Sequence, residues 1–196
     1  MLFLDVSCGF FWGLAYLAAI ILGFKNRTFY IPALSICMNF SWEFWVVVSR
    51  ISRGEFLTVA LAIQLLWLIF DVGIILTWQL FRKKERFAHS KDLCCFLCVF
   101  ILVYFWAFLG SNWELSVFVI NLIMSLDFIF RLRLDDSKHT SFFIAVTKLL
   151  GTFAATALNG LLYRNAMICW LGGLCLIMDI YYIVLLKKGD IARERV

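Results

Sequence analysis

The chain has 196 residues, of which 64% are hydrophobic and only 16% charged, and it contains a single proline. Its mean hydropathy of +0.93 excludes an ordinary soluble globular domain and indicates a polytopic membrane protein. The formal net charge is +5. In a membrane protein an excess of positive charge reflects the orientation of the chain in the membrane and an attraction to anionic lipid headgroups. We therefore expect the lipid bilayer as a partner and no nucleic-acid binding.

Apolar runs long enough to cross a bilayer follow one another along most of the chain. A spanning helix needs about 20 residues, and these runs are continuous with no alternation at period two, which favours helices over a transmembrane barrel. The runs fall at residues 8–24, 29–49, 56–81, 93–110, 114–130, 141–163 and 167–186. The sequence therefore predicts an all-α membrane protein, a bundle of seven transmembrane helices that forms a single domain over residues 1–196.

The connections between these runs alternate in charge. The segments near 25–27, 82–91 and 131–138, together with the C-terminal tail, are rich in Lys and Arg, whereas the alternate connections hold Arg50, Arg53 and Arg164. Since cytoplasmic loops accumulate Lys and Arg, we expect the N-terminus outside and the C-terminus in the cytoplasm. The first run lacks a basic n-region and a cleavage site, so we interpret it as a retained helix. The membrane would be the endoplasmic reticulum in a fungus and the plasma membrane in a bacterium.

Two of the apolar runs carry carboxylates beside tryptophans. In the stretch NFSWEFW, Asn39 and Glu43 are four residues apart and Trp42 lies beside them, and Trp67 and Asp71 repeat this spacing in the next run. Residues four apart share one face of a helix. A charged side chain at the bilayer centre costs at least about 2.5 kcal/mol on insertion scales, so a functional role is the default interpretation.

The last two runs carry a second polar set. Lys148 begins a stripe that continues through Thr152 and Thr156 to Asn159, and Asp179 is three residues before Tyr182. With a rise of about 1.5 Å per residue, Glu43, Asp71, Asp179 and Lys148 reach depths similar enough to share one chamber. Lys148 is a candidate substrate-binding residue, although a structural ion pair with a nearby acid is the simpler role.

Aromatic residues surround the polar positions in the sequence. We expect the carboxylates to be lined by Trp42, Trp45, Trp67, Tyr181 and Tyr182, and we assign Trp12, Trp106, Trp113 and most phenylalanines to the membrane interface and the lipid. Aromatic faces stabilise desolvated cations, and a carboxylic acid in an apolar environment can stay protonated and serve as a general acid. This combination suits an enzyme that cyclises its substrate through a carbocation.

Four short motifs extend this interpretation. N-F-S-W-E-F at 39–44, W-x-x-x-D at 67–71, K-L-L-G-T at 148–152 and D-x-x-Y at 179–182 resemble the transmembrane terpene cyclases of fungal meroterpenoid and indole-diterpene biosynthesis. The resemblance implies an isomerase or lyase type of reaction on a lipophilic prenylated substrate: an acid protonates a terminal epoxide, or an alkene, and internal alkenes capture the cation. It assigns the essential acids to Glu43 and Asp179 and matches Asp71 less distinctively.

From the motifs we predict roles for individual residues. Either Glu43 or Asp179 donates the proton, and the other orients the donor or shares its proton. Asn39 and Asn159 hydrogen-bond the acid or the epoxide oxygen, and Trp42, Trp67 and Tyr182 shield the cations. We expect no cofactor and no metal, because the chain lacks a metal-binding D-D-x-x-D motif with its downstream partner and Cys94-Cys95-x-x-Cys98 lacks ligands at suitable spacing.

A small proton-coupled transporter or carrier that binds through the same carboxylates is the alternative. L-I-F-D-V at 68–72 and L-I-M-D-I at 176–180 hint at two three-helix repeats around a central helix. Discontinuous transporter helices usually carry a Gly or Pro break near the midplane, whereas the only proline, Pro32, lies close to a helix end. A seven-helix receptor has no positive support, because the connections are short.

Overall fold

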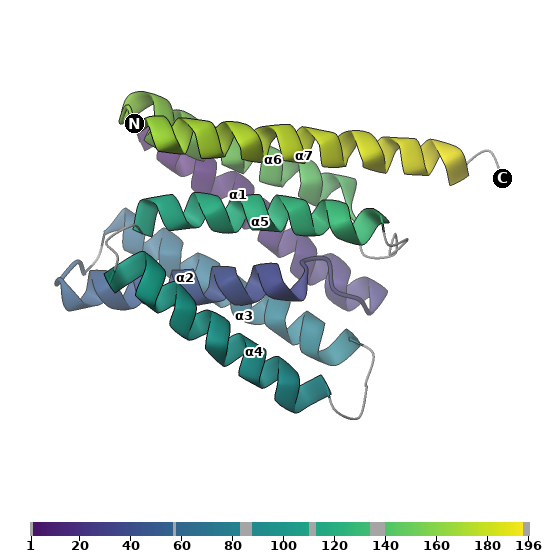
Figure 1. Ribbon diagram of the computed structural model, residues 1–196, viewed down its shortest axis with the longest axis horizontal. Coiled ribbons are helices and arrows are strands. Elements are labelled where there is room, and N and C mark those ends of the chain that lie inside the picture. The colour runs from purple at the N-terminus through teal and green to yellow at the C-terminus, as the bar shows by residue number, and fades with distance from the viewer. Residues whose placement is uncertain (1, 57, 83–87, 110–112, 134–139, 194–196) are drawn as a thin grey trace.

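The computed structural model describes residues 2–56, 58–82, 88–109, 113–133 and 140–193, and the elements within these ranges are all helical (Figure 1). Two of the α-helices continue into short π-helical segments, η1 and η3. The elements in chain order are α1 (Leu2–Asn26), α2 (Ala33–Ser52), α3 (Val59–Phe81), α4 (Ala88–Val103), η1 (Tyr104–Leu109), α5 (Trp113–Arg133), α6 (Phe142–Thr156), η3 (Ala157–Leu162) and α7 (Ala166–Arg193). Each apolar run of the sequence therefore corresponds to one helix, or to one helix with its π-helical continuation.

Local sequence signals set several of the helix starts. Pro32 is the N-cap of α2, where its missing N–H costs nothing. The hydroxyl of Thr58 accepts from the backbone N–H of Leu61 at 3.1 Å and caps α3, and Ser141 does the same for Ile144 at 3.4 Å in α6. Such caps satisfy backbone donors that the first helical turn leaves unpaired.

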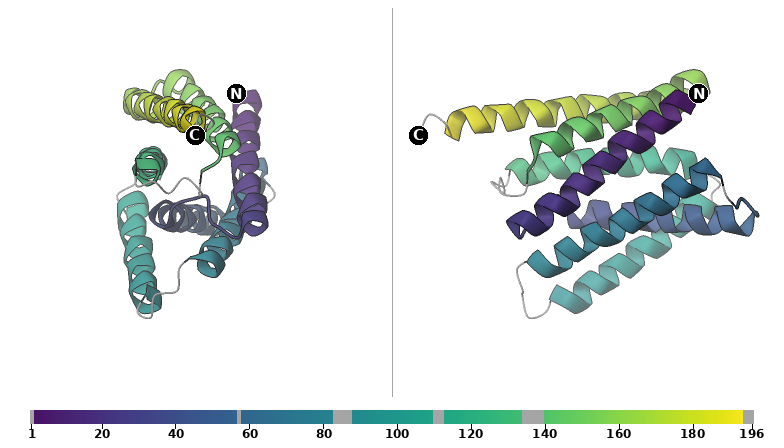
Figure 2. Two further views of the ribbon diagram at one scale, coloured as in Figure 1. Left: turned by 90° about the vertical axis from the view of Figure 1, so that its right-hand side faces the viewer. Right: turned by 180° about the vertical axis from the view of Figure 1, so that it is seen from behind.

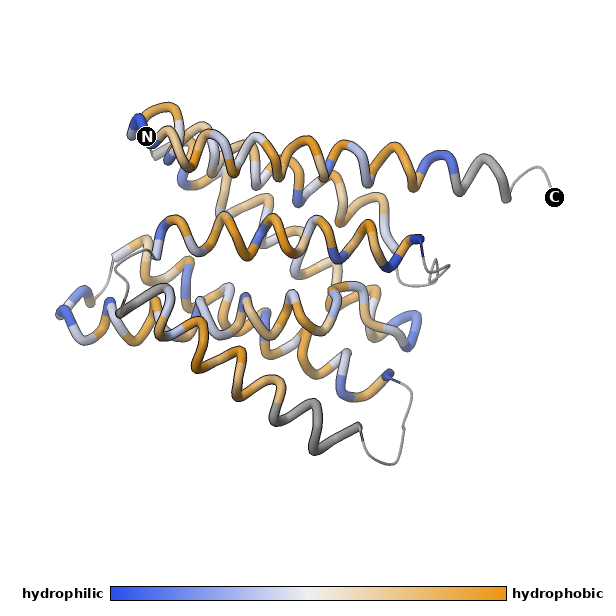
Figure 3. Tube along the Cα trace, in the orientation of Figure 1, coloured by the Kyte–Doolittle hydropathy of each residue, from blue (hydrophilic) through white to orange (hydrophobic). Residues whose placement is uncertain are grey.

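Within the described ranges, five helical segments are by length and composition apolar enough to cross a membrane: Phe3–Asn26, Val59–Phe81, Trp113–Arg133, Phe142–Leu162 and Ala166–Lys188. Figure 3 shows the hydrophobic colouring along most of the trace and hydrophilic positions gathered toward the helix ends. The segment Cys95–Trp106 is apolar but shorter. Helix α2 is not in this set, although it has 20 residues, because its polar side chains, including Asn39 and Glu43, lower its hydropathy.

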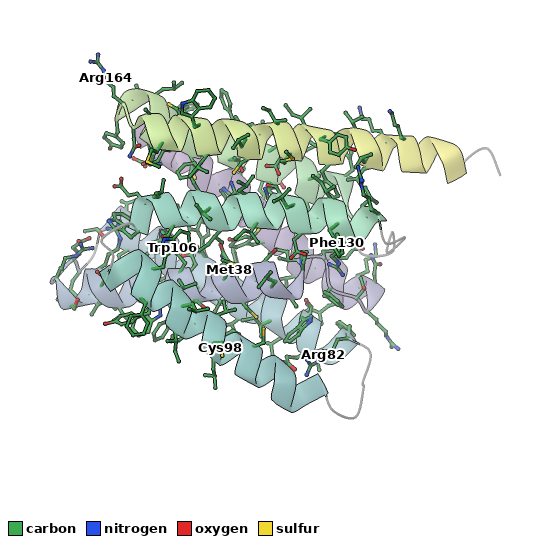
Figure 4. The ribbon with its side chains drawn as sticks, viewed as in Figure 1. Met38, Arg82, Cys98, Trp106, Phe130 and Arg164 are labelled. Carbon is green, nitrogen blue, oxygen red and sulfur yellow. The ribbon has the colours of Figure 1, made fainter. Side chains whose placement is uncertain are left out.

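The helices surround an interior to which α2, α5 and α6 contribute most of the buried polar residues. Helix α1 packs between α3 and α6, α7 packs against α5 and α6, and α2 contacts α3, α4 and α5. The end-on view of Figure 2 shows α2 among these neighbours, so the polar residues Asn39 and Glu43 on this helix are shielded on several sides. The N-terminus and the C-terminus lie at opposite ends of the bundle (Figure 1). Arg164 and Arg82 likewise mark opposite ends (Figure 4).

The apolar core fills one half of the bundle. Its buried members come from the second half of α1, α3, α5 and α7 and from the start of α6, and they include Ala15, Ile74, Met124, Ile144 and Leu186. Because successive helices run in opposite directions, these positions all lie toward the end that carries the C-terminus (Figure 1). The other half, near the N-terminus, is where the bundle is hollow.

Candidate active site

A cavity of about 790 Å³ occupies the half of the bundle near the N-terminus. This volume is within the range of small-molecule sites, about 300 to 1,000 Å³. Its walls come from α1, α2, α3, α5, α6 and η3, and beside apolar residues such as Met124 and Leu158 they carry these aromatic and polar side chains: Trp12, Tyr16, Asn39, Trp42, Glu43, Gln64, Trp67, Asn121 and Asn159. Residues that are distant in sequence thus meet around one space.

Glu43 is the carboxylic acid in the wall of the deep part of this cavity. Its side chain is almost fully buried, at 2% exposed, and its Oε2 atom has no hydrogen-bond partner among the residues that the structure describes. Asp71 is completely buried behind it and lies close enough for the two carboxyl groups to interact electrostatically. Asp71 itself is not a wall residue of the cavity. A buried polar atom without a partner is rare in a folded protein and calls for an explanation, of which a catalytic role is one.

Asn39 connects the acid pair to the opposite wall. Its side-chain amide donates to Asp71 Oδ2 at 2.9 Å and to the hydroxyl oxygen of Tyr16 at 2.7 Å. Asn39 and Glu43 are one helical turn apart on α2, as the sequence spacing predicts. The amide therefore links Asp71 to Tyr16, and Asn39 and Tyr16 line the cavity together with Glu43.

Two tryptophans form the wall between α2 and α5. The indole N–H of Trp42 donates to Ser116 Oγ at 2.9 Å and to the carbonyl oxygen of Trp113 at 3.1 Å. The rings of Trp42 and Trp113 stack with their centroids 6.3 Å apart. Trp67 lies on α3 across from them, and its buried indole N–H has no partner within the described part of the chain. The wall of the cavity thus contains the rings of these three tryptophans and one indole N–H without a described partner.

The assignment of Trp12 and Trp113 to the membrane interface is wrong, since both line the cavity. Trp12 lies against α6 because Gly151 leaves room for it: a Cβ atom at residue 151 would be 2.6 Å from the Trp12 ring. The ring also meets Tyr16 edge-on at 5.7 Å. The i, i+4 spacing of Trp12 and Tyr16 was the available signal, because it repeats the spacing of Asn39 and Glu43.

Lys148 and Asp179 form a separate buried ion pair. Lys148 Nζ is 2.7 Å from Asp179 Oδ1 and donates to Ser125 Oγ at 2.8 Å, and both charged side chains are at most 4% exposed. Neither residue is in the cavity wall. Lys148 Nζ lies 5.7 Å from the centroid of Trp12, whose ring is part of that wall. Of the four residues expected to share a chamber, only Glu43 lines it, because similar depth does not decide which way a side chain faces.

The remaining candidates divide between the cavity and other surroundings. Asn159, on η3, lines the cavity and donates to the carbonyl oxygen of Ala155 at 3.0 Å. Tyr182 is buried against Phe128, with ring centroids 5.3 Å apart, and belongs to the apolar core. Trp45 instead packs on Phe100 and Tyr104, and Tyr181 accepts from Arg133 at 2.8 Å. Trp42 and Trp67 are therefore the expected aromatic residues that reach the cavity.

No group of three or more His, Cys, Asp or Glu side chains is arranged to hold a metal ion in the part of the chain that the structure describes. Cys94 and the Asp135-Asp136 pair lie outside the residues whose side chains are described.

Comparison with known proteins identifies relatives along almost the whole chain. The family model of the Pyr4-like transmembrane terpene cyclases matches residues 1–188. Terpene cyclase spyD of Aspergillus fumigatus is 24% identical over 205 aligned residues, which cover 91% of this chain and 84% of spyD. The Pyr4-family terpene cyclase mfmH of Annulohypoxylon moriforme is 29% identical over 114 residues, covering 55% of this chain and 46% of mfmH. No solved structure matches.

Proposed function

The chain belongs to the Pyr4-like transmembrane terpene cyclases, and on that premise we propose that it protonates a terminal epoxide of a prenyl chain and guides the resulting carbocation through ring closure in its aromatic cavity. It is an integral membrane protein of a cyclase family. The mechanism of cyclisation is the proposal. The observation that carries the proposal is Glu43, a buried acid with an unpartnered oxygen in the wall of a cavity lined by tryptophans.

The chemistry needs one proton donor and no other reactant. The carboxyl proton of Glu43 passes to the epoxide oxygen as the bond from that oxygen to the more substituted carbon breaks. The π electrons of the next alkene form a carbon–carbon bond to the cationic carbon, and further alkenes repeat this step. The last cation then loses a proton from a neighbouring carbon to a base, either water or the Glu43 carboxylate, so the acid is restored and the product is an isomer of the substrate.

The neighbours of Glu43 suit this role. Two carboxyl groups close enough to interact inside an apolar interior are most readily accommodated when only one of them is ionised, so we assign to Asp71 the role of keeping a proton on the pair. Asn39 holds Asp71 through its 2.9 Å hydrogen bond. The faces of Trp12, Trp42 and Trp67 stabilise the developing cation by roughly 0.5 to 2 kcal/mol each. Asn159 is placed to hydrogen-bond an oxygen of the substrate from the η3 wall.

For Asp179 we propose a structural role through Lys148. Their ion pair lies behind the Trp12 ring, so it supports that part of the cavity wall without touching the substrate. Tyr182 belongs to the core on the same side of the bundle and supports the packing of α7 against α5. This assignment leaves Glu43 as the proton donor.

We also propose that all seven helices cross the membrane, with the N-terminus outside and the C-terminus in the cytoplasm. The opposite placement of the two termini supports an odd number of crossings (Figure 1). The connections at 83–87 and 134–139 lie outside the described residues, so the proposed orientation rests on their basic sequence. In this orientation the cavity lies toward the non-cytoplasmic side.

Conversion of epoxidised substrates tests the proposed function. Membranes that contain the wild-type chain, and membranes that lack it, are incubated with terminally epoxidised farnesyl and geranylgeranyl aromatics, and the products are analysed by mass spectrometry. We expect an isomer of unchanged mass and shifted retention only with the protein. In D₂O, initiation at the epoxide leaves no deuterium on carbon, whereas initiation at an alkene leaves one carbon-bound deuterium. If no member of the panel is converted and proteoliposomes show substrate- or proton-driven flux instead, the protein is a carrier.

A further inference from the structure

The mouth of the cavity differs chemically from its depth. The deep walls carry aromatic rings, amides and the single acid Glu43, whereas charged residues from three helices meet where the cavity opens: Asp5 near the start of α1, Arg50 near the end of α2 and Glu114 at the start of α5. Asp5 and Glu114 are exposed. A site for a purely hydrocarbon chain has no need of such an entrance.

Arg50 is held rigidly at this mouth. Its Nη1 atom is 2.6 Å from Glu55 Oε2, and the backbone N–H of Glu55 donates to the carbonyl oxygen of Arg50 at 3.0 Å. The chain turns back in this way because Gly54 has φ of +76°, a left-handed conformation that residues with a Cβ atom rarely adopt. The turn therefore places a carboxylate against one side of the guanidinium group and fixes the direction of the other.

One donor of this guanidinium group lacks a partner. The Nε atom of Arg50 is buried and has no hydrogen-bond partner among the described residues, while the side chain as a whole is 18% exposed and lines the cavity. An arginine N–H is always a donor, because the group stays charged at any physiological pH. Leaving such a donor unpaired away from water is costly, and an oxygen of a ligand bound beside Arg50 is one acceptor that would satisfy it.

The spacing between Arg50 and Glu43 sets the length of that occupant. Arg50 follows Glu43 by seven residues, and seven residues turn an α-helix by about 700°, only about 20° short of two full turns. Both side chains therefore leave α2 on the same face, separated by a rise of about 10.5 Å along the helix. Both line the same cavity. A ligand with its reactive end at Glu43 and an oxygen near Arg50 therefore spans from the deep acid to the mouth.

We propose that Arg50 is a positioning residue that anchors the polar head of the substrate, through a hydrogen bond from its Nε–H to a neutral carbonyl or phenolic oxygen, with the prenyl chain pointing inward to Glu43. The inference rests on the proposed cyclase function and adds the orientation of the substrate. The charge at the mouth supports a neutral head: Arg50 and Arg53 are both paired with Glu55, and the wall also carries the carboxylates of Asp5 and Glu114, so these residues leave no surplus cation for a carboxylate or a diphosphate.

Two probe molecules separate the head from the chain. One is a terminally epoxidised farnesyl aromatic with a carbonyl on its ring, and the other is the same epoxidised chain ending in a methyl group. Binding to the purified full chain in detergent is followed by tryptophan fluorescence, which requires no turnover, and KM and kcat are measured alongside. Arg50→Met removes the donor, and Arg50→Lys keeps a cation near Glu55 but lacks the Nε–H. Arg53→Met is the matched control, because Arg53 also contacts Glu55, is 55% exposed and is absent from the cavity wall.

We expect both Arg50 variants to raise Kd and KM for the carbonyl-bearing probe by about ten- to a hundredfold, the loss of one hydrogen bond from a charged donor, with kcat little changed. The methyl-ended probe should bind all variants as it binds the wild type, and Arg53→Met should match the wild type throughout. Equal Kd for wild type and both Arg50 variants, or equal losses for both probes, would overturn the anchor. Arg50-dependent binding without any conversion would leave the anchor standing and contradict the cyclase mechanism instead, and a wild type that binds neither probe contradicts both.

Discussion

Replacing Asp179 by asparagine tests whether the Lys148–Asp179 pair is structural. The substitution keeps the shape of the side chain. Lys148, which is 2% exposed as a residue, then keeps only Ser125 and the Trp12 ring as neighbours of its ammonium group. Removing one partner of a buried ion pair costs about 3 to 5 kcal/mol, which shifts the unfolding equilibrium by roughly a hundredfold to a few thousandfold. We therefore expect Asp179→Asn to unfold at a clearly lower temperature and to lose conversion.

The double variant Lys148→Met with Asp179→Leu shows which loss is the cause. Apolar residues of similar volume often replace a buried pair at no cost in stability. Thermal unfolding in detergent and conversion of the epoxidised panel are measured on the wild type and on the single and double variants. If the pair only supports the wall, the double variant recovers both stability and conversion. An Asp179→Asn variant as stable as the wild type would refute the ion-pair argument. A stable double variant without activity would indicate that Asp179 takes part in catalysis.

Four further substitutions, at three positions, test the cavity and its immediate surroundings. Asp71→Asn keeps the hydrogen bond to Asn39 possible but removes the second carboxyl, so conversion should fall, though less than on loss of the Glu43 acid; an equal loss would make Asp71 an equal candidate for the donor. Trp67→Phe keeps a ring face and should preserve the product pattern, whereas Trp67→Leu should lower full cyclisation about two- to thirtyfold and release partly cyclised products; identical products from both would exclude a role for the ring. Gly151→Ala must displace Trp12 and should lower stability by about 1 to 3 kcal/mol, measured as a fall in the unfolding temperature; an unchanged unfolding temperature would show that Trp12 moves at no cost.

The helices could be predicted from the sequence because length and hydropathy decide them locally. Each apolar run corresponds to a helix, and Pro32 starts α2 where a proline is tolerated. The shared face of Asn39 and Glu43 on α2 could also be predicted, since their i, i+4 spacing is enough to place them side by side.

What the sequence could not show is which helix faces meet. Glu43 and Asp179 have similar depth, yet one lines the cavity and the other pairs with Lys148, because the packing of α1 between α3 and α6 places Trp12 between them. Trp45 lies three residues after Trp42 but packs on η1, a choice made by the position of α4. Arg50 reads as an ordinary loop cation until the turn at Gly54 and the burial of its Nε atom are known.

The most direct test of the account is the conversion rate of Glu43→Gln. The amide keeps the size of the side chain and removes the proton that the epoxide needs, so the variant should fold as the wild type does and lose about 100- to 10,000-fold in rate, the usual contribution of a general acid. Asp127→Asn is the matched control, because this carboxyl accepts from Ser35 at 2.7 Å outside the cavity. Wild-type rates from Glu43→Gln, in membranes where the control behaves as wild type, would contradict the assignment of Glu43 as the proton donor.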